Sequence, residues 1–151
     1  MNAPGNITSL DGTTLEDVVD TFEVLDEWED RYRYLIELGR KLPAYPEAAR
    51  TDAHKVRGCV SQVWLNPSFS DDNPPKFFFD GDSDAHIVKG LVAVMMLLFN
   101  GKTAEEITAT DARAVLDELG LSRHLSPMRT NGLFSMLGRI QALAAQKSKA
   151  V

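Results

Sequence analysis

The chain has 151 residues, of which 44% are hydrophobic, and this predicts one compact domain with a core of its own. Its 22 acidic residues outnumber its 16 basic ones, and the basic residues form no block, which argues against nucleic acid or another polyanion as a partner. A single cysteine excludes an internal disulfide and any Cys-rich zinc or iron–sulfur site made by this chain alone.

The first residues predict neither a signal peptide nor a membrane anchor. Residues 1–13 are polar, lack the charged and apolar regions of a secretory signal, and are expected to be a flexible arm of a single domain, 1–151. The most apolar stretch, residues 87–99, contains Lys89 and is too short to cross a membrane. We therefore expect a cytoplasmic protein.

Two helices are predicted before Pro43. Thr14 and Asp17 have the spacing of a capping pair, and apolar residues follow them at helical spacing, so a short helix is expected here. A second helix is predicted to begin at Asp26 and to end near Pro43, because proline cannot continue a helix.

Three extended segments are predicted next. Residues 54–57 and 60–69 contain strand-forming residues and flank a tight turn at Gly58 and Cys59. The run 70–75 is rich in turn residues, and residues 76–79 are expected to return as a third strand closed by Asp80 and Gly81. The result is a small three-stranded antiparallel sheet, with Trp64 expected in the core.

Four helices are predicted after the sheet. The segment 84–100 is apolar on nearly all sides, so it is expected to be the central core helix, capped by Asp82 or Ser83. The others are a short helix opened by a capping box of Thr103 and Glu106, a helix over 112–119 that ends at Gly120, and a long last helix opened by Ser126 and Pro127. This order predicts an α+β fold with helices on one face of the sheet.

Cys59 is the principal candidate for chemistry. A lone cysteine in a cytosolic protein is most often inert packing. Here Gly58 would allow the backbone of another protein to approach, and the cations of Lys55 and Arg57 would favour the nucleophilic thiolate. Because Lys55 and Arg57 alternate, they could instead simply point to solvent, and packing stays the alternative at this stage.

A family resemblance adds to this interpretation. The stretches that carry it are 34–39 with 42–43, 56–64, 81–85, 87–91, and 125–129 with 131–133. Through these stretches the sequence, from about Trp28 to Gln146, resembles the SufE family of cysteine desulfuration proteins. Val60 stands where the family often has glutamine, and the amino-terminal arm is longer than usual.

The resemblance implies a fold, a reaction and partners. The fold would be the one shared with the NifU-related scaffold proteins, without their three ligand cysteines. Cys59 would take sulfur from the persulfide of a SufS-like cysteine desulfurase, stimulate that enzyme, and pass the sulfur to a SufBCD-like iron–sulfur scaffold. The chain would need no metal or cofactor, since pyridoxal phosphate belongs to the desulfurase, and it would be a monomer or a weak homodimer. We expect the thiol to be partly protected until the partner arrives.

Four further residues are expected to support Cys59 or to meet the partner: Arg57, Gly58, Asp84 and Arg129. A cation in the first turn of a helix opposes the helix dipole by about 0.3–1 kcal/mol, so something else should favour Arg129. Our hypothesis is that it lies near Cys59 and stabilises an anion or binds the desulfurase; a solvated side chain or an ordinary ion pair is the alternative. Asp84 is explained by helix capping or by restraint of the cysteine loop.

Two rival functions remain open from the residues. The chain could be a stand-alone thiol sulfurtransferase, although no run of small residues predicts the anion-binding loop that such an enzyme needs. It could also be a cluster scaffold or carrier, in which two Cys59 thiols of a dimer would need His54 and His86 as further ligands. A metal role for His54 within one chain is not favoured, because no local cluster supplies enough ligands.

Overall fold

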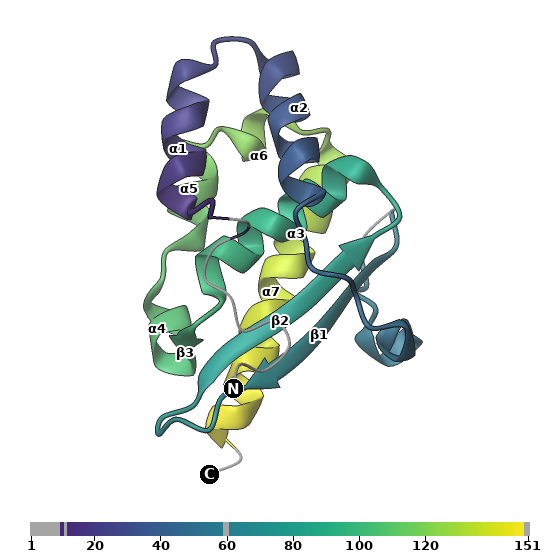
Figure 1. The fold of residues 1–151 in the computed structure, drawn as a ribbon, viewed down its shortest axis with the longest axis vertical. Coiled ribbons are helices and arrows are strands. Elements are labelled where there is room, and N and C mark those ends of the chain that lie inside the picture. The colour runs from purple at the N-terminus through teal and green to yellow at the C-terminus, as the bar shows by residue number, and fades with distance from the viewer. Residues whose placement is uncertain (1–9, 11, 59–60, 150–151) are drawn as a thin grey trace.

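The computed structural model describes residue 10, residues 12–58 and residues 61–149 (Figure 1). Its elements are α1 (Leu15–Val24), α2 (Trp28–Gly39), the 3-10 turns η1 (Glu47–Ala49) and η2 (Asp52–His54), β1 (Val63–Phe69), β2 (Lys76–Ser83), α3 (His86–Phe99), β3 (Lys102–Thr103), α4 (Ala104–Ala109), α5 (Ala112–Glu118), α6 (Leu121–His124) and α7 (Pro127–Lys149). The strands form one antiparallel sheet in the order β1-β2-β3. The predicted α+β class is therefore confirmed.

The hydrophobic core lies between the sheet and the helices. β1 pairs with β2 along its whole length, from Val63 opposite Ser83 to Phe69 opposite Phe77. α3 and α7 lie behind this hairpin in the view of Figure 1, and α3 is buried along almost its entire length, as its apolar sequence predicts. Within the described ranges, no helix is both long enough and apolar enough to cross a membrane.

Glycines bring α3 unusually close to its neighbours. A Cβ atom at Gly81 of β2 would lie 2.5 Å from Cγ1 of Val92, and one at Gly39 would lie 2.7 Å from the backbone nitrogen of Gly90. A Cβ at Gly90 would overlap the carbonyl of Leu35. The backbones of α2 and α3 therefore touch, and β2 continues through Gly81 because only glycine fits beneath the helix.

Three helix starts that were predicted from local sequence are confirmed. Thr14 with Asp17 and Thr103 with Glu106 each form a complete capping box. The long last helix begins at Pro127, and its Arg129 amide donates to the Ser126 hydroxyl at 3.3 Å. These helix starts are fixed by contacts within three residues. The predicted arm ends in a folded turn, since Leu10 is buried and pairs with Thr13, whereas residues 1–9 and 11 lie outside the described residues.

The first of the three predicted strands is wrong, whereas the other two correspond to β1 and β2. Residues 54–57 form no strand: His54 ends the η2 turn, and only Lys55 makes an isolated bridge, to Trp64. The third strand is β3, because α3 returns the chain to the outer edge of β2, where the Gly101 amide donates to the Phe77 carbonyl at 2.9 Å. Trp64 is only half-buried and is not a core residue, because its ring faces a guanidinium group and not the apolar core.

Candidate functional site

Cys59 and Val60 lie outside the described residues, so the site is defined by the chain on either side of them. The structure places Gly58 before the cysteine and Ser61 after it. The Val56 amide donates to the Val63 carbonyl at 2.8 Å, and Val56 is buried. This hydrogen bond joins the two ends of the segment 57–62, which contains Cys59.

Gly58 is fixed by its own backbone and by α7. Its φ is +89°, in the left-handed region that side chains other than glycine rarely adopt. A Cβ atom at this position would also lie 2.6 Å from the Ser135 hydroxyl oxygen in the middle of α7. The residue before the cysteine is therefore pressed against the last helix, and glycine is needed there for two separate reasons.

Asp84 holds the other side of the segment. Its Oδ1 accepts the Gln62 amide at 3.0 Å, its Oδ2 accepts the Gln62 side-chain amide at 3.4 Å, and its own amide donates to the Gln62 carbonyl at 3.3 Å. These contacts support the expectation that Asp84 restrains this part of the chain. They do not support its role as a helix cap, since α3 begins only after Ala85.

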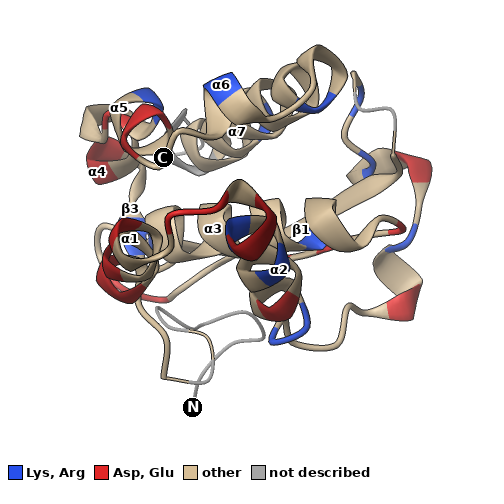
Figure 2. Cartoon of the chain, turned by 90° about the horizontal axis from the view of Figure 1, so that it is seen from above, with Lys and Arg blue, Asp and Glu red and all other residues tan. Residues whose placement is uncertain are grey.

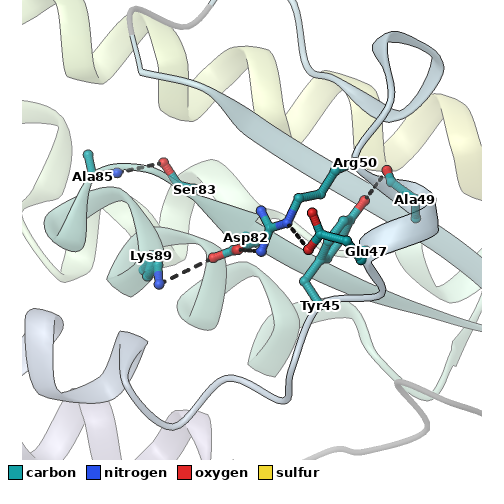
Figure 3. Close-up of polar contacts among 8 residues, drawn as sticks. All are labelled: Tyr45, Glu47, Ala49, Arg50, Asp82, Ser83, Ala85 and Lys89. Atoms are coloured by element: carbon teal, nitrogen blue, oxygen red, sulfur yellow. Dashed lines mark hydrogen bonds and ion pairs between the residues drawn. The ribbon is translucent and has the colours of Figure 1, made fainter.

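The predicted capping of α3 by Asp82 or Ser83 is wrong. Ala85 is the residue before the helix, and no side chain caps the helix amides. The Ser83 hydroxyl instead accepts the Ala85 amide at 3.2 Å in a local turn, and the Asp82 carboxylate is taken by distant cations (Figure 3). A carboxylate that already has charged partners is not available to cap a helix.

Asp82 is the centre of an ion cluster that ties the preceding loop to the sheet. Arg50 Nη2 lies 2.5 Å from its carboxylate and Lys89 Nζ lies 3.4 Å from it, while Arg50 Nε pairs with Glu47 at 3.1 Å (Figure 3). The Arg50 guanidinium also lies over the rings of Tyr45 and Trp64, 5.2 and 5.1 Å from their centres. The loop that leads to the cysteine segment is thus fastened to β2.

The cluster shifts several pKa values. Burial alone would raise the pKa of Asp82, but the Arg50 hydrogen bond, the Ser83 amide and the charge of Lys89 outweigh it, so this pKa is lowered. The hydrogen bond to Asp82 raises the pKa of Arg50. Burial is the main reason why the pKa of Tyr45 rises to about 12. Asp82 and Arg50 are consequently both ionised at neutral pH.

Arg129 borders an apolar cavity next to the cysteine segment. The cavity has a volume of about 180 Å³, and Ser61 and Arg129 line it together with apolar residues of α3 and α7, among them Val88, Leu91 and Met136. Arg129 is half-buried, and it forms no ion pair with any residue that the structure describes. The ion pair considered as an alternative is therefore not found in that part of the chain, whereas Ser61, two residues after Cys59, does share the cavity with Arg129.

Arg57 borders a different cavity from Arg129. It is exposed and lines a second, polar hollow with Lys55 and Arg139. Sequence reasoning missed Arg139, Ser135 and Arg50, because each acts through contacts with a distant part of the chain and leaves no local pattern. His54 bonds Thr51 at 3.0 Å, and no three His, Cys, Asp or Glu side chains gather as a metal site among the residues described.

Three comparisons place the chain among known proteins. The family described as "SufE: Fe-S metabolism associated domain" matches residues 16–144. An uncharacterised SufE-like protein of Rhizobium meliloti is 53% identical over 133 residues, which cover 87% of this chain and 95% of that protein. The sulfur acceptor protein CsdE of Escherichia coli is 42% identical over 137 residues, covering 89% of this chain and 92% of CsdE.

Solved structures agree with this placement at the level of the fold. A solution structure of a hypothetical protein from Thermus thermophilus superimposes with a TM-score of 0.71, covering 89% of this chain and 96% of the other, at 20% sequence identity. That likeness concerns the fold alone. The family match over most of the chain and the two relatives above 40% identity carry the assignment, and the chain belongs to the SufE family.

Proposed function

We propose that this chain is a sulfur acceptor in iron–sulfur metabolism and that Cys59 receives the sulfur from a cysteine desulfurase. The family assignment and the relative named a sulfur acceptor support this role. The observation that carries it to Cys59 is the anchoring of the chain around that residue: the Val56–Val63 hydrogen bond, the Asp84–Gln62 contacts and the packing of Gly58 on Ser135 all hold one short segment.

The proposed reaction needs one thiol on each protein. The Cys59 thiolate attacks the terminal sulfur of the persulfide on the desulfurase cysteine, and a new sulfur–sulfur bond forms on Cys59. The old sulfur–sulfur bond breaks at the same time, and the desulfurase cysteine leaves as a thiolate. No net oxidation or reduction occurs, so no metal or redox cofactor of this chain is required. We propose that Cys59 then passes the sulfur to a scaffold, and that the removal of persulfide stimulates the desulfurase.

Arg129 would serve this reaction through its charge. Both the attacking thiolate and the product persulfide are anions, and a cation stabilises anions more strongly beside an apolar cavity than in water. Arg129 has no ionic partner among the described residues, and it shares its cavity with Ser61. The restraint of Gln62 by Asp84 would keep the segment beside that cavity until the partner docks.

The deciding experiment mixes the protein with the cysteine desulfurase of the same organism and with cysteine, and follows sulfide release and intact mass. The wild type should gain one sulfur atom and raise the turnover of the enzyme, and Cys59→Ser should do neither. Arg129→Gln should slow the gain about tenfold, equivalent to about 1.4 kcal/mol. Arg123→Gln, an exposed arginine on α6, is the matched control and should behave as wild type.

Failure would be clear from the same samples. If folded wild-type protein gains no mass and leaves the desulfurase unchanged, the acceptor role is wrong. Mass gain from thiosulfate without any desulfurase would instead favour a stand-alone sulfurtransferase. If Arg129→Gln equals Arg123→Gln in rate, Arg129 has no part in the transfer, whatever the role of Cys59.

A further inference from the structure

A basic hollow lies beside the cysteine segment, and its lining residues differ from those of the apolar cavity. It is lined by residues of the stretch that precedes Gly58 and of α7, and its volume is about 580 Å³. Its charged members are Lys55, Arg57, Arg139 and a single carboxylate, Asp52. We use the name basic hollow for these four charged residues together with Ser135.

The positive charges of the basic hollow are not neutralised by the rest of the described chain. Lys55, Arg57 and Arg139 form no ion pair with any described carboxylate, although the chain as a whole is acidic, with a net charge of −6. Arg139 donates to the uncharged Ala53 carbonyl at 3.3 Å, which positions its guanidinium without cancelling its charge.

The acidic residues gather elsewhere. In Figure 2 they colour much of α1 and α4, whereas the opposite end of the molecule carries both blue and red segments. In a protein with a net negative charge, an uncompensated basic hollow attracts anions to that place. The hollow therefore has the charge pattern of a binding site for a negatively charged group.

The position of the hollow indicates what that group belongs to. Lys55 and Arg57 precede Cys59 in the chain, and Ser135 is the residue against which Gly58 is packed. Any protein that brings its own cysteine to Cys59 must cover this surface. Because arginine and lysine side chains at such a rim recognise carboxylates through charge-assisted hydrogen bonds, an acidic segment of the docking protein is the occupant that fits.

We propose that the basic hollow receives one or two carboxylate side chains of the cysteine desulfurase and so selects the partner that reaches Cys59. This inference rests on the proposed function, since it names the surface by which the sulfur donor docks. Nucleic acid does not fit, because the net negative charge of the chain would repel its phosphates. The hollow acts on association rather than on the transfer of sulfur itself.

The test measures KM for this chain as the acceptor in the desulfurase reaction, together with kcat. Lys55→Glu should raise KM about tenfold, because charges at the rim of an interface govern encounter. Arg139→Gln should raise KM about threefold and leave kcat within about twofold; glutamine removes the charge but can still donate to the Ala53 carbonyl. Lys76→Glu is the matched control: the same charge change at the exposed far end of the hairpin should leave KM unchanged.

Salt provides the second measurement. Raising NaCl from about 0.05 to about 0.3 M should increase KM of the wild type strongly and that of Lys55→Glu only weakly, since screening acts on charge pairs that the variant has lost. Equal KM values for Lys55→Glu and Lys76→Glu would overturn the proposal. The proposal would also be overturned if the wild-type protein bound inorganic sulfate in the hollow while the hollow variants kept the wild-type KM. The hollow would then be a site for small anions. Absence of sulfur transfer in the wild type would instead reject the proposed function.

Discussion

The two ends of the β1–β2 hairpin are held in different ways. At the turn end, Ser70 closes the loop by itself: its amide donates to the Lys76 carbonyl at 2.9 Å, and its hydroxyl accepts the Lys76 amide at 2.9 Å. At the open end, the contacts come from residues that are distant in the chain, such as Arg50 to Asp82 and Gly58 to Ser135. The turn loop is closed by its own residues, although β3 pairs with Lys76 and Phe77 beside it, whereas the open end is held by contacts with distant parts of the chain. The residues that flank Cys59 are at the open end.

The largest effect is expected from Gly58→Ala at the open end. Alanine at a φ of +89° costs about 1–2 kcal/mol, and the overlap with Ser135 adds about 1–3 kcal/mol. We expect the free energy of unfolding in urea to fall by about 3 kcal/mol and sulfur acceptance to be lost.

Two variants separate these causes. Gly12 has a φ of +82° and no described atom within 4 Å of its Cβ position, so Gly12→Ala should show the backbone cost alone, about 1 kcal/mol. Combining Gly58→Ala with Ser135→Ala should recover about half of the loss. A Gly58→Ala protein as stable as Gly12→Ala would show that contact with α7 does not constrain the segment.

A smaller effect is expected when the ion cluster is broken. Arg50→Met should lower the free energy of unfolding at pH 7 by about 2 kcal/mol, because it leaves the mostly buried Asp82 with Lys89 alone. Arg40→Met removes an exposed pair with Glu37 and should cost about 0.5 kcal/mol. Urea unfolding of both variants checks the difference.

The effect of Arg50→Met should also depend on pH. The pKa of Asp82 is lowered in the folded protein, so its stabilisation is complete above its unfolded pKa of about 3.9 and is lost as the pH falls through the folded value. The gap between wild type and Arg50→Met should therefore be constant from about pH 5 to 7 and should narrow below about pH 4. A gap that stays constant down to about pH 3 would mean that stacking on Tyr45 and Trp64, not the ion pair, holds Arg50.

An effect on stability smaller than that of Arg50→Met, and the sharpest contrast between the two ends, is expected for Asp84→Ala and Ser70→Ala. Each removes a side chain that accepts backbone amides, so each should cost about 1 kcal/mol. Hydrogen exchange of the Gln62 amide should become about fivefold faster in Asp84→Ala and remain unchanged in Ser70→Ala. If both variants accelerate the Gln62 amide equally, the two ends of the hairpin are coupled and the contrast between them fails.

This contrast also explains which features could be predicted from the sequence. The capping boxes at Thr14 and Thr103 and the start of α7 were predicted correctly, because the deciding contacts lie within three residues. The edge strand β3 was not predicted, since its position depends on where α3 returns the chain. The interactions of Asp82 were not predicted either, because they involve a loop 32 residues away. A local pattern at Asp82 and Ser83 indicated a helix cap, but the long-range ion pair with Arg50 prevailed.

The candidate site divides in the same way. Cys59, Gly58 and Arg57 form a recognisable run in the sequence. The cation of Arg129 in the first turn of a helix drew attention to that residue, and the family resemblance added the nearness of Asp84 to the cysteine loop. Ser135 and Arg139 could not be found, because nothing in the sequence of α7 indicates which of its turns faces a segment so much earlier in the chain. The placement of such residues requires the packed structure.

The contact between the backbones of α2 and α3 has a consequence for how this family can diverge. Gly39 and Gly90 face each other so closely that a methyl group on either one would overlap the opposite helix. Neither glycine can be substituted without a shift of the opposite helix, even if the surface of the protein or its partner changes. We expect both glycines to persist in distant homologues, including any in which the cysteine has been replaced.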